Sequence, residues 1–144
     1  MKIKAGVITA NFLLLSIIIS GCATTSTQEK LLESGTSQVQ LRSIQTRAFE
    51  TTDKEKTLRT IIATLQDLGF VIDKADAVLG SVSATKLDTY ALRMTVTVRP
   101  KGESQLMVRA NAQYETMMVT DPQPYQQFFA SLEKAMFLAA QQVD

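Results

Sequence analysis

The sequence YALRMTVTVR, residues 90–99, alternates between two sets of side chains. The first set is apolar and consists of Tyr90, Leu92, Met94, Val96 and Val98. The second set is mostly polar and consists of Ala91, Arg93, Thr95, Thr97 and Arg99. A period of two over this length predicts a β-strand with one buried face and one face in water. This strand sets the core of any fold the chain adopts.

The segments around this strand extend it into a sheet. Pro100–Glu103 predicts a hairpin turn. The returning strand has a second apolar set, which consists of Leu106, Val108, Ala110, Ala112 and Tyr114. Before residue 90, the patterns predict strands at 43–50, 70–73 and 79–85. The strand at 79–85 buries either Leu79 or Val82, depending on a bulge at Gly80.

Two segments have helical spacing. In residues 53–68, apolar side chains recur every three or four residues, and Gly69 provides a stop. Thr52 and Glu55 match a capping box at its start. In residues 124–142 the apolar stripe is built on aromatic side chains, including Phe128 and Phe129. We therefore expect a helix in each segment.

The element order is β-α-β-β-β-β-α, which predicts an α+β fold in residues 41–144. The longest strands have one apolar face, and each helix has one wide apolar stripe. The economical packing is a single antiparallel sheet with both helices on one face and the other face in water. We expect Leu65 and Phe128 to be almost fully buried against Leu92, Val96 and Val108. Core packing is also the default expectation for Phe70, Tyr90 and Tyr114.

This layout resembles a helix-grip arrangement, in which a long C-terminal helix lies across a curved sheet. The stretch TLRTIIATLQDLGFVIDKADAVLGSVSATK, residues 57–86, resembles the helix–strand–strand segment of helix-grip domains in the lipoprotein of the outer-membrane barrel assembly machine. The shared features are an apolar helix, Leu68-Gly69-Phe70, an acidic turn and Gly80 before a strand. That relative has two such domains and a long N-terminal segment that binds a partner, whereas this chain has one domain and a short linker.

Composition excludes several classes of function. The 144 residues include 15 basic and 14 acidic side chains, one cysteine and no histidine. A net charge of +1 gives no electrostatic basis for binding nucleic acid. Without histidine there is no Ser-His-Asp triad, no Cys-His pair and no Cys/His zinc site. Scattered glycines give no phosphate-binding loop. We expect no enzyme activity, no metal and no cofactor.

The N-terminus has the layout of a secretory signal peptide over residues 1–21. Lys2 and Lys4 precede an apolar run that ends at Ile19, and Ser20-Gly21 supplies small residues for cleavage. The alternative is a retained transmembrane anchor, which needs about 20 predominantly apolar residues. Polar residues interrupt this run, and no basic stop follows it, so we favour a cleaved signal.

The only cysteine, Cys22, follows directly. Ile19-Ser20-Gly21-Cys22 resembles the lipobox of bacterial lipoproteins. The resemblance implies that a diacylglyceryl group is attached to the Cys22 thiol and that the chain is cleaved between Gly21 and Cys22. More than one acyl chain would anchor the protein stably in a membrane. A lone thiol on a secreted chain otherwise has no purpose.

Residues 22–40 are rich in Ser, Thr and Gln and predict a flexible tether after the lipidated cysteine. Leu31 and Leu32 are its only adjacent leucines, either incidental or a docking point. Residue 23 is Ala and not the Asp that tends to retain enterobacterial lipoproteins in the inner membrane. The resemblance therefore implies the outer membrane, with the domain facing the periplasm. Loss of Lys2 and Lys4 from the 15 basic residues leaves 13 against 14 acidic ones, a net charge of −1.

The water-facing side of the sheet is the candidate partner surface. Arg93, Met107 and Arg109 should project from neighbouring strands and form one contiguous patch, with Arg99 nearby. Arginine and methionine are enriched in protein interfaces, although any exposed sheet face also needs long polar side chains. The run Thr116–Thr120 is a second candidate, which either extends a strand into the core or forms an exposed apolar patch.

Two functions remain open. The first is a lipid-anchored, non-catalytic accessory or scaffold module of an envelope complex in assembly, secretion or efflux. The second is a binding domain for a small hydrophobic or lipid ligand, held between helix and sheet. Large inward side chains that fill this space would favour the first. The partners we expect are a membrane, through the lipid, and an envelope protein. The sequence leaves the oligomeric state and the identity of the partner open.

Overall fold

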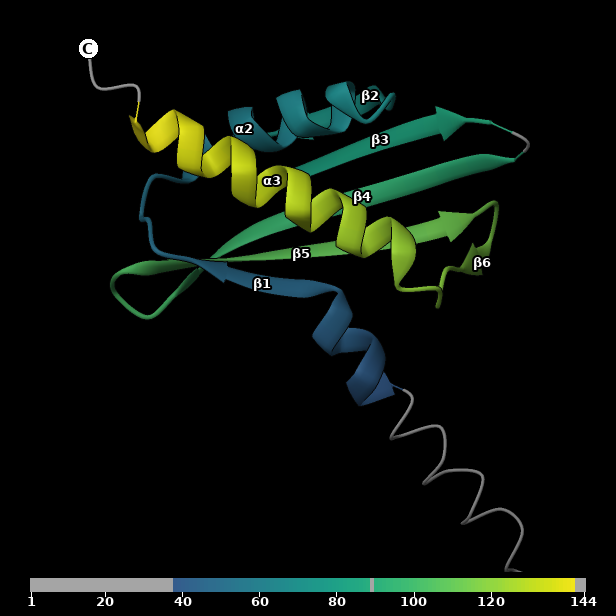
Figure 1. Ribbon diagram of the computed structural model, residues 1–144, viewed down its shortest axis with the longest axis horizontal. Coiled ribbons are helices and arrows are strands. Elements are labelled where there is room, and N and C mark those ends of the chain that lie inside the picture. Colours follow the sequence, from purple (N-terminus) through teal and green to yellow (C-terminus); the bar gives the residue numbers. More distant parts are fainter. Residues whose placement is uncertain (1–37, 89, 142–144) are drawn as a thin grey trace, which may run out of the picture. The chain divides into compact units, whose positions relative to one another are not determined.

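The computed structural model describes residues 38–88 and 90–141, which belong to one compact unit. The predicted signal peptide, Cys22 and most of the predicted tether lie outside the described residues. The order of elements is β1 (Thr46–Phe49), α2 (Lys54–Asp67), β2 (Val71–Asp76), β3 (Ser81–Leu87), β4 (Ala91–Lys101), β5 (Gln105–Tyr114), β6 (Met117–Met118) and α3 (Gln123–Gln141). Figure 1 shows the long helices α2 and α3 and a sheet. A short helical segment, residues 38–44, precedes β1.

The strands form one antiparallel sheet in the order β1-β5-β4-β3-β2. The sixth strand, β6, pairs with the end of β5. The long β4–β5 hairpin lies at the centre, as the alternation in residues 90–99 requires. The predicted α+β fold with a single antiparallel sheet is confirmed.

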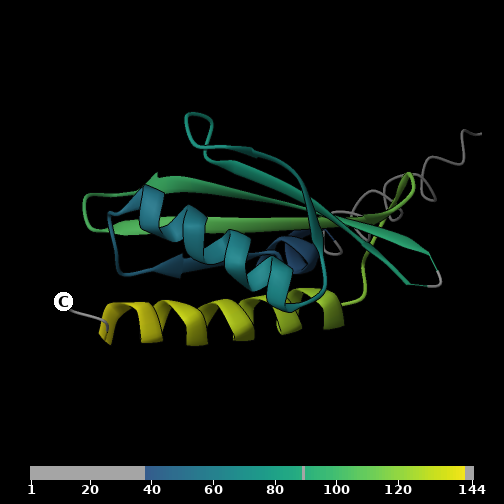
Figure 2. The ribbon, with the colours of Figure 1, turned by 90° about the horizontal axis from the view of Figure 1, so that it is seen from above.

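Both long helices cover the same face of the sheet, which we call the inner face (Figure 2). Helix α2 packs on β2, β3 and β4, and α3 packs on β5 and α2. The side chains of Leu65 and Phe128 are 0% exposed, and both belong to one core cluster with Val96 and Val108. This part of the core prediction is confirmed, while Leu92 packs against the cluster from a half-buried position.

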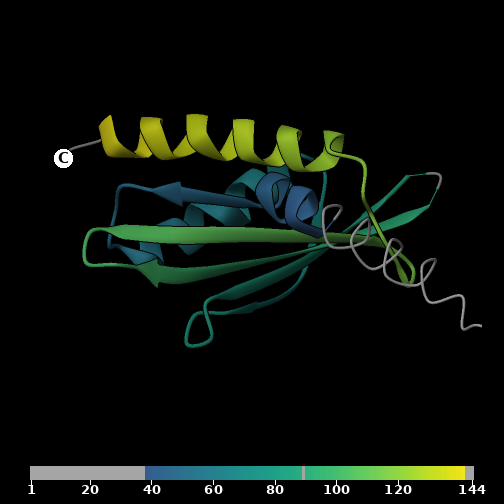
Figure 3. The ribbon, with the colours of Figure 1, turned by 90° about the horizontal axis from the view of Figure 1, so that it is seen from below.

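The opposite side of the sheet, which we call the outer face, is covered by no helix in the part of the chain that the structure describes (Figure 3). It holds the residues that alternate with the buried ones along each strand. In β4, for example, Met94, Val96 and Val98 are buried, while Arg93 and Arg99 are exposed. One face builds the core and the other meets solvent.

The start of the domain differs from the prediction. Residues 43 and 44 are helical, and β1 begins only at Thr46. Residues 38–40, assigned to the tether, belong to the same helical segment. Leu41 in this segment and Gln45 directly after it are buried, so one side of the segment packs against the domain. Their spacing of four residues is helical, which explains why no strand forms here.

The cap of α2 also differs from the prediction. Asp53, and not Thr52, is the N-cap, because an Asp53 carboxylate oxygen accepts a hydrogen bond of 2.8 Å from the Lys56 amide. An ionised carboxylate is also favoured at the positive end of the helix dipole. Thr52 contributes only its carbonyl, which accepts from the Lys54 amide. The capping box is therefore wrong, and the helix starts one residue later than expected.

The β2–β3 hairpin is longer than expected. Strand β2 continues to Asp76 across a register shift at Asp73, so the predicted turn at 74–77 lies mostly inside the strand. The bulge prediction near Gly80 resolves in favour of Val82, which is 1% exposed, whereas Leu79 is exposed. Gly80 has a φ of 68°, and a Cβ there would lie 2.7 Å from the Val98 carbonyl oxygen. Glycine is therefore required for both conformation and space.

The β4–β5 turn is tighter than expected. Both strands continue past the predicted turn, so Pro100 pairs with Leu106 and Lys101 with Gln105. The pairing of β3 with β4 ends at Thr97. The β3 side of β4 is therefore unpaired at Pro100, and the missing amide hydrogen of Pro100 costs no hydrogen bond between strands. The reversal is made by residues 102–104, where Gly102 has a φ of 64°.

The hydroxyl of Tyr125 joins three segments at the β5 edge. It donates to the Val119 carbonyl at 2.8 Å and accepts from the Ala112 amide and the Gln45 side-chain amide at 3.2 Å each. Tyr125 is 0% exposed and Gln45 is 2% exposed. Along this edge, β5 pairs first with β1 and then with β6, and Ala112 lies between the two paired stretches. The Tyr125 hydroxyl supplies the hydrogen-bond acceptor that the Ala112 amide needs there.

Candidate functional site

The predicted partner residues all lie on the outer face. Arg93 pairs with Gln113 and Thr85, Arg109 with Thr97 and Thr46, and Met107 with Arg99 and Ala48. Arg93 is exposed, whereas Met107 and Arg109 are half-buried. Each alternates with a buried neighbour of the core, which is why all three point away from the helices.

The three residues form two groups and not one cluster. Met107 and Arg109 are two residues apart on β5 and therefore adjacent on the same face. Arg93 is four residues from Thr97, the partner of Arg109, so it lies about 13 Å further along the strands. Thr95 and Asn111 occupy the row between them. A partner must span this distance to contact both groups.

The charge of the outer face is one-sided over β3, β4 and β5. The charged side chains that these strands direct outward are all cationic: Arg93, Arg99, Lys101 and Arg109. Asp73 and Asp76 lie on the edge strand β2, where Asp73 accepts a hydrogen bond from the Thr85 hydroxyl and Asp76 from the Leu79 amide. Within residues 38–141, the two ion pairs found, Arg47–Glu133 and Arg59–Glu55, involve none of the four cations.

Arg109 is the least satisfied of the four. Its Nε is shielded from solvent and has no hydrogen-bond partner among the described residues. A guanidinium carries five donors in a fixed fork and has no acceptor of its own. Among the described residues, no carboxylate forms an ion pair with Arg109 and no acceptor meets its Nε, whereas the nearby hydroxyls of Ser83 and Thr95 bond to each other at 3.2 Å.

A second feature lies at the end of the inner face, where the prediction was wrong. Tyr90 is 69% exposed and Tyr114 is 39% exposed, although both continue the apolar sets of β4 and β5. The β3–β4 end of the sheet extends beyond the start of α3, so no helix among the described residues covers this end (Figure 1). Their centroids are 6.5 Å apart in an edge-to-face arrangement. Met117 pairs with Tyr114 and is also exposed.

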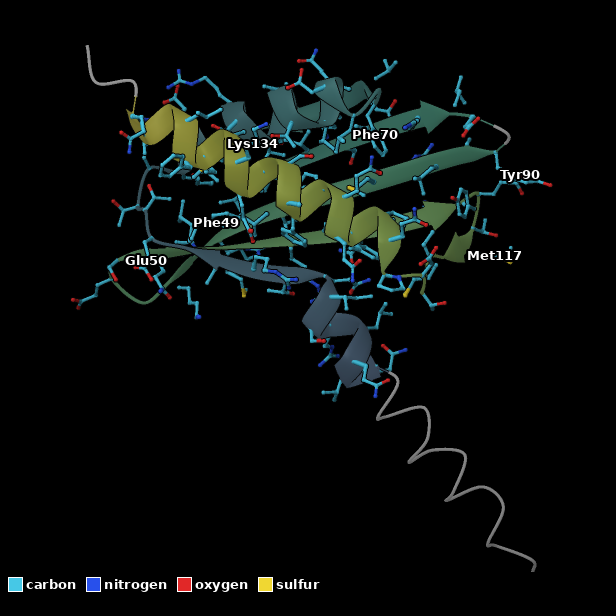
Figure 4. The ribbon with its side chains drawn as sticks, in the orientation of Figure 1. Phe49, Glu50, Phe70, Tyr90, Met117 and Lys134 are labelled. Atoms are coloured by element: carbon cyan, nitrogen blue, oxygen red, sulfur yellow. The ribbon has the colours of Figure 1, made fainter. Side chains whose placement is uncertain are left out.

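The same end of the sheet is hollowed into an open cleft of about 510 Å³, which we call the end cleft. Figure 4 shows Tyr90 and Met117 at this end of the sheet. The apolar lining consists of Leu68, Phe70, Tyr90, Leu92, Tyr114 and Pro124. The polar lining consists of Lys86, Asp88, Asp121, Gln123 and Gln127. Sequence periodicity could not find this cleft, because it arises from where α3 begins and not from which face a side chain takes.

The run Thr116–Thr120 divides between the two alternatives left open above. Met117 and Met118 form β6 and are exposed, whereas Val119 is buried and donates its amide to the Ala112 carbonyl. The run is therefore an exposed apolar edge for two residues and part of the core for one.

The space between helices and sheet is filled by side chains. Tyr125, Phe128, Phe129, Leu132, Ile61 and Leu65 are each 0–2% exposed. Over the ranges 38–88 and 90–141, no group of three potential metal ligands comes together. None of the helices described there has the length and hydrophobicity of a membrane span.

Comparison with known proteins adds no assignment. No protein-family profile matches the chain, and no curated protein matches it either. Its functional assignment therefore rests on the residues and geometry described above.

Proposed function

We propose that the chain is a lipid-anchored, non-catalytic accessory module of a bacterial outer-membrane envelope complex, and that it contacts its partner through the outer face. The observation that carries the proposal is the one-sided charge of β3, β4 and β5. Arg93, Arg99, Lys101 and Arg109 have no carboxylate beside them on these strands and take part in neither ion pair of the described residues. Such a face is complementary to an acidic protein surface.

The composition of the face also supports a protein partner. Arginine can form forked contacts with a carboxylate, and methionine adapts its shape to a neighbouring surface. Met107 pairs with Arg99 on β4 and lies two residues from Arg109 on β5, so apolar and charged contacts would be adjacent. The core does not need these side chains, because they point away from it.

The second candidate, a binding domain for a small hydrophobic or lipid ligand, is favoured by one observation. The end cleft has a volume of about 510 Å³, which is within the usual range of ligand pockets. The space between helix and sheet, where the sequence suggested a ligand would lie, is occupied by Phe128, Phe129 and Leu65.

The anchor is tested separately from the partner surface. Cys22→Ala removes the only thiol that can receive lipid, so the variant should remain unprocessed or become soluble. Cell fractionation with mass analysis of the product measures this. If the alanine variant still fractionates with membranes at the mature size, lipid attachment at Cys22 is wrong.

The partner surface is tested by reversing charge on the outer face. Arg93→Glu together with Arg109→Glu should reduce recovery of crosslinked envelope partners while changing the free energy of unfolding by less than about 0.5 kcal/mol. The matched control is Arg59→Glu together with Lys134→Glu, which makes the same change in net charge on the exposed surface of the helices. Equal recovery from the two double variants would place the interface elsewhere.

A further inference from the structure

The end cleft combines an apolar floor with aromatic walls. Phe70 is 7% exposed and Leu92 half-buried, so the floor is firmly held by the core. Tyr90 and Tyr114 line the same cleft and contact each other edge to face. Tyrosine offers a large apolar area with little conformational freedom to lose, and for this reason it is enriched in protein-binding surfaces.

The exposed apolar surface is larger than the cleft itself. Met117 is 73% exposed and is not among the lining residues, yet its register with Tyr114 puts it on the same face. A small ligand inside the cleft would contact Tyr90 but leave Met117 in water. A protein segment that runs over the rim would cover Met117 as well as the tyrosines, and exposed apolar patches mark interaction sites of this kind.

The charges of the cleft favour a cationic occupant. Its lining holds one cation, Lys86, and two carboxylates, Asp88 and Asp121. The Lys86 ammonium lies 6.0 Å from the centre of the Phe70 ring, so the fold already gives it a partner. Both aspartates are exposed, and neither belongs to an ion pair found among the described residues. The faces of the tyrosine rings also attract cations.

From this combination we infer that the end cleft binds a short segment of a partner protein in which an apolar side chain lies next to a lysine or arginine. The apolar side chain would pack on Phe70 and Leu92 beside the pair of tyrosine rings. The cation would lie near Asp88 and Asp121. This site differs from the cationic outer face in both position and charge, so it goes beyond the proposed function and can fail independently of it.

The experiment is a selection from a phage-displayed library of random peptides on the purified domain. The enriched sequences should combine an aromatic or aliphatic residue with a nearby lysine or arginine. An enriched peptide is then synthesised with a fluorescent label, and its dissociation constant is measured by polarisation. A selection without enrichment, or one that enriches acidic sequences, overturns the inference.

Two sets of variants locate the binding site. Tyr90→Ser together with Tyr114→Ser should weaken the peptide by about tenfold or more, because aromatic anchors dominate such interfaces. Asp88→Asn together with Asp121→Asn should weaken it severalfold and reduce its dependence on salt. Asparagine at 121 keeps the acceptor for the Gln123 amide, so the start of α3 is preserved. The matched control is Phe137→Ser, an exposed aromatic at the far end of α3, which should leave the affinity within about twofold.

Thermal melting of each variant shows whether it is folded. Full affinity in the folded tyrosine double variant, or full affinity in the aspartate double variant, overturns the inference. A parallel titration uses the apolar dye 1-anilinonaphthalene-8-sulfonate. If the dye binds at the tyrosines more tightly than any selected peptide, the end cleft is a small-ligand site and the inference is wrong.

Discussion

The three tyrosines of the chain occupy two opposite environments. Tyr125 is 0% exposed, and its hydroxyl takes part in three hydrogen bonds that link Gln45, Ala112 and Val119. Tyr90 and Tyr114 lie at the uncovered end of the inner face, where the polar tips meet water and the rings touch each other. The first environment stabilises the fold, and the second leaves aromatic surface available to a partner.

The direction in which a side chain points from the sheet therefore does not by itself determine whether it is buried. Tyr90 and Leu92 continue the alternation of Met94, yet exposure increases from Met94 through Leu92 in β4 to Tyr90 directly before this strand, where the sheet extends beyond the helices. A side chain is buried only if it lies on the inner face and a helix covers it. Apolar side chains on the inner face that no described helix covers are candidates for binding.

The largest effect is expected where the helices do cover the sheet. Phe128→Ala or Leu65→Ala should lower the free energy of unfolding by about 2–5 kcal/mol, because each leaves a cavity among fully buried neighbours. Denaturant titration measures the change. Losses below about 0.5 kcal/mol for both variants would contradict the packing of two helices on one face.

A smaller loss is expected from the buried tyrosine. Tyr125→Phe removes only the hydroxyl, and this leaves the Ala112 amide and the Gln45 side-chain amide without their partner. The free energy of unfolding should fall by about 1–3 kcal/mol. Tyr90→Phe is the matched control and should change it by less than about 0.5 kcal/mol. Equal effects of the two substitutions would remove the contrast between the environments.

A smaller difference is expected at the start of α2, where Asp53 and Thr52 are the two candidates for the N-cap. Asp53→Ala should cost about 1 kcal/mol, because it removes the acceptor of the Lys56 amide. Thr52→Ala should be nearly neutral, since only the backbone carbonyl of Thr52 is engaged. Thermal melts of the two variants distinguish them. A larger loss for Thr52→Ala would restore the capping box that the sequence suggested.

Local patterns predicted most of the fold. Alternation in residues 90–99 and 106–114 identified the central hairpin, and helical spacing identified α2 and α3 to within one residue at most ends. The errors lie where distant contacts decide. Residues 38–44 are helical and bury Leu41, and Gln45 reaches the phenol of Tyr125, which is 80 residues away in sequence.

The candidate sites divide in the same way. Arg93, Met107 and Arg109 could be placed on the outer face from the period of two alone, and the structure adds their separation into two groups. The end cleft could not be predicted, because it depends on the point at which α3 begins relative to the ends of β4 and β5. No pattern within a strand contains that information.

The central claim is that the outer face, and not the exposed surface of the helices, contacts the envelope partner. A photoreactive amino acid placed at position 107 on β5, and separately at position 134 on α3, tests this in intact cells. Lys134 is exposed and lies on the side opposite the outer face (Figure 4). We expect a discrete crosslinked product from position 107 and none from position 134. A product from position 134 with none from position 107 would contradict it.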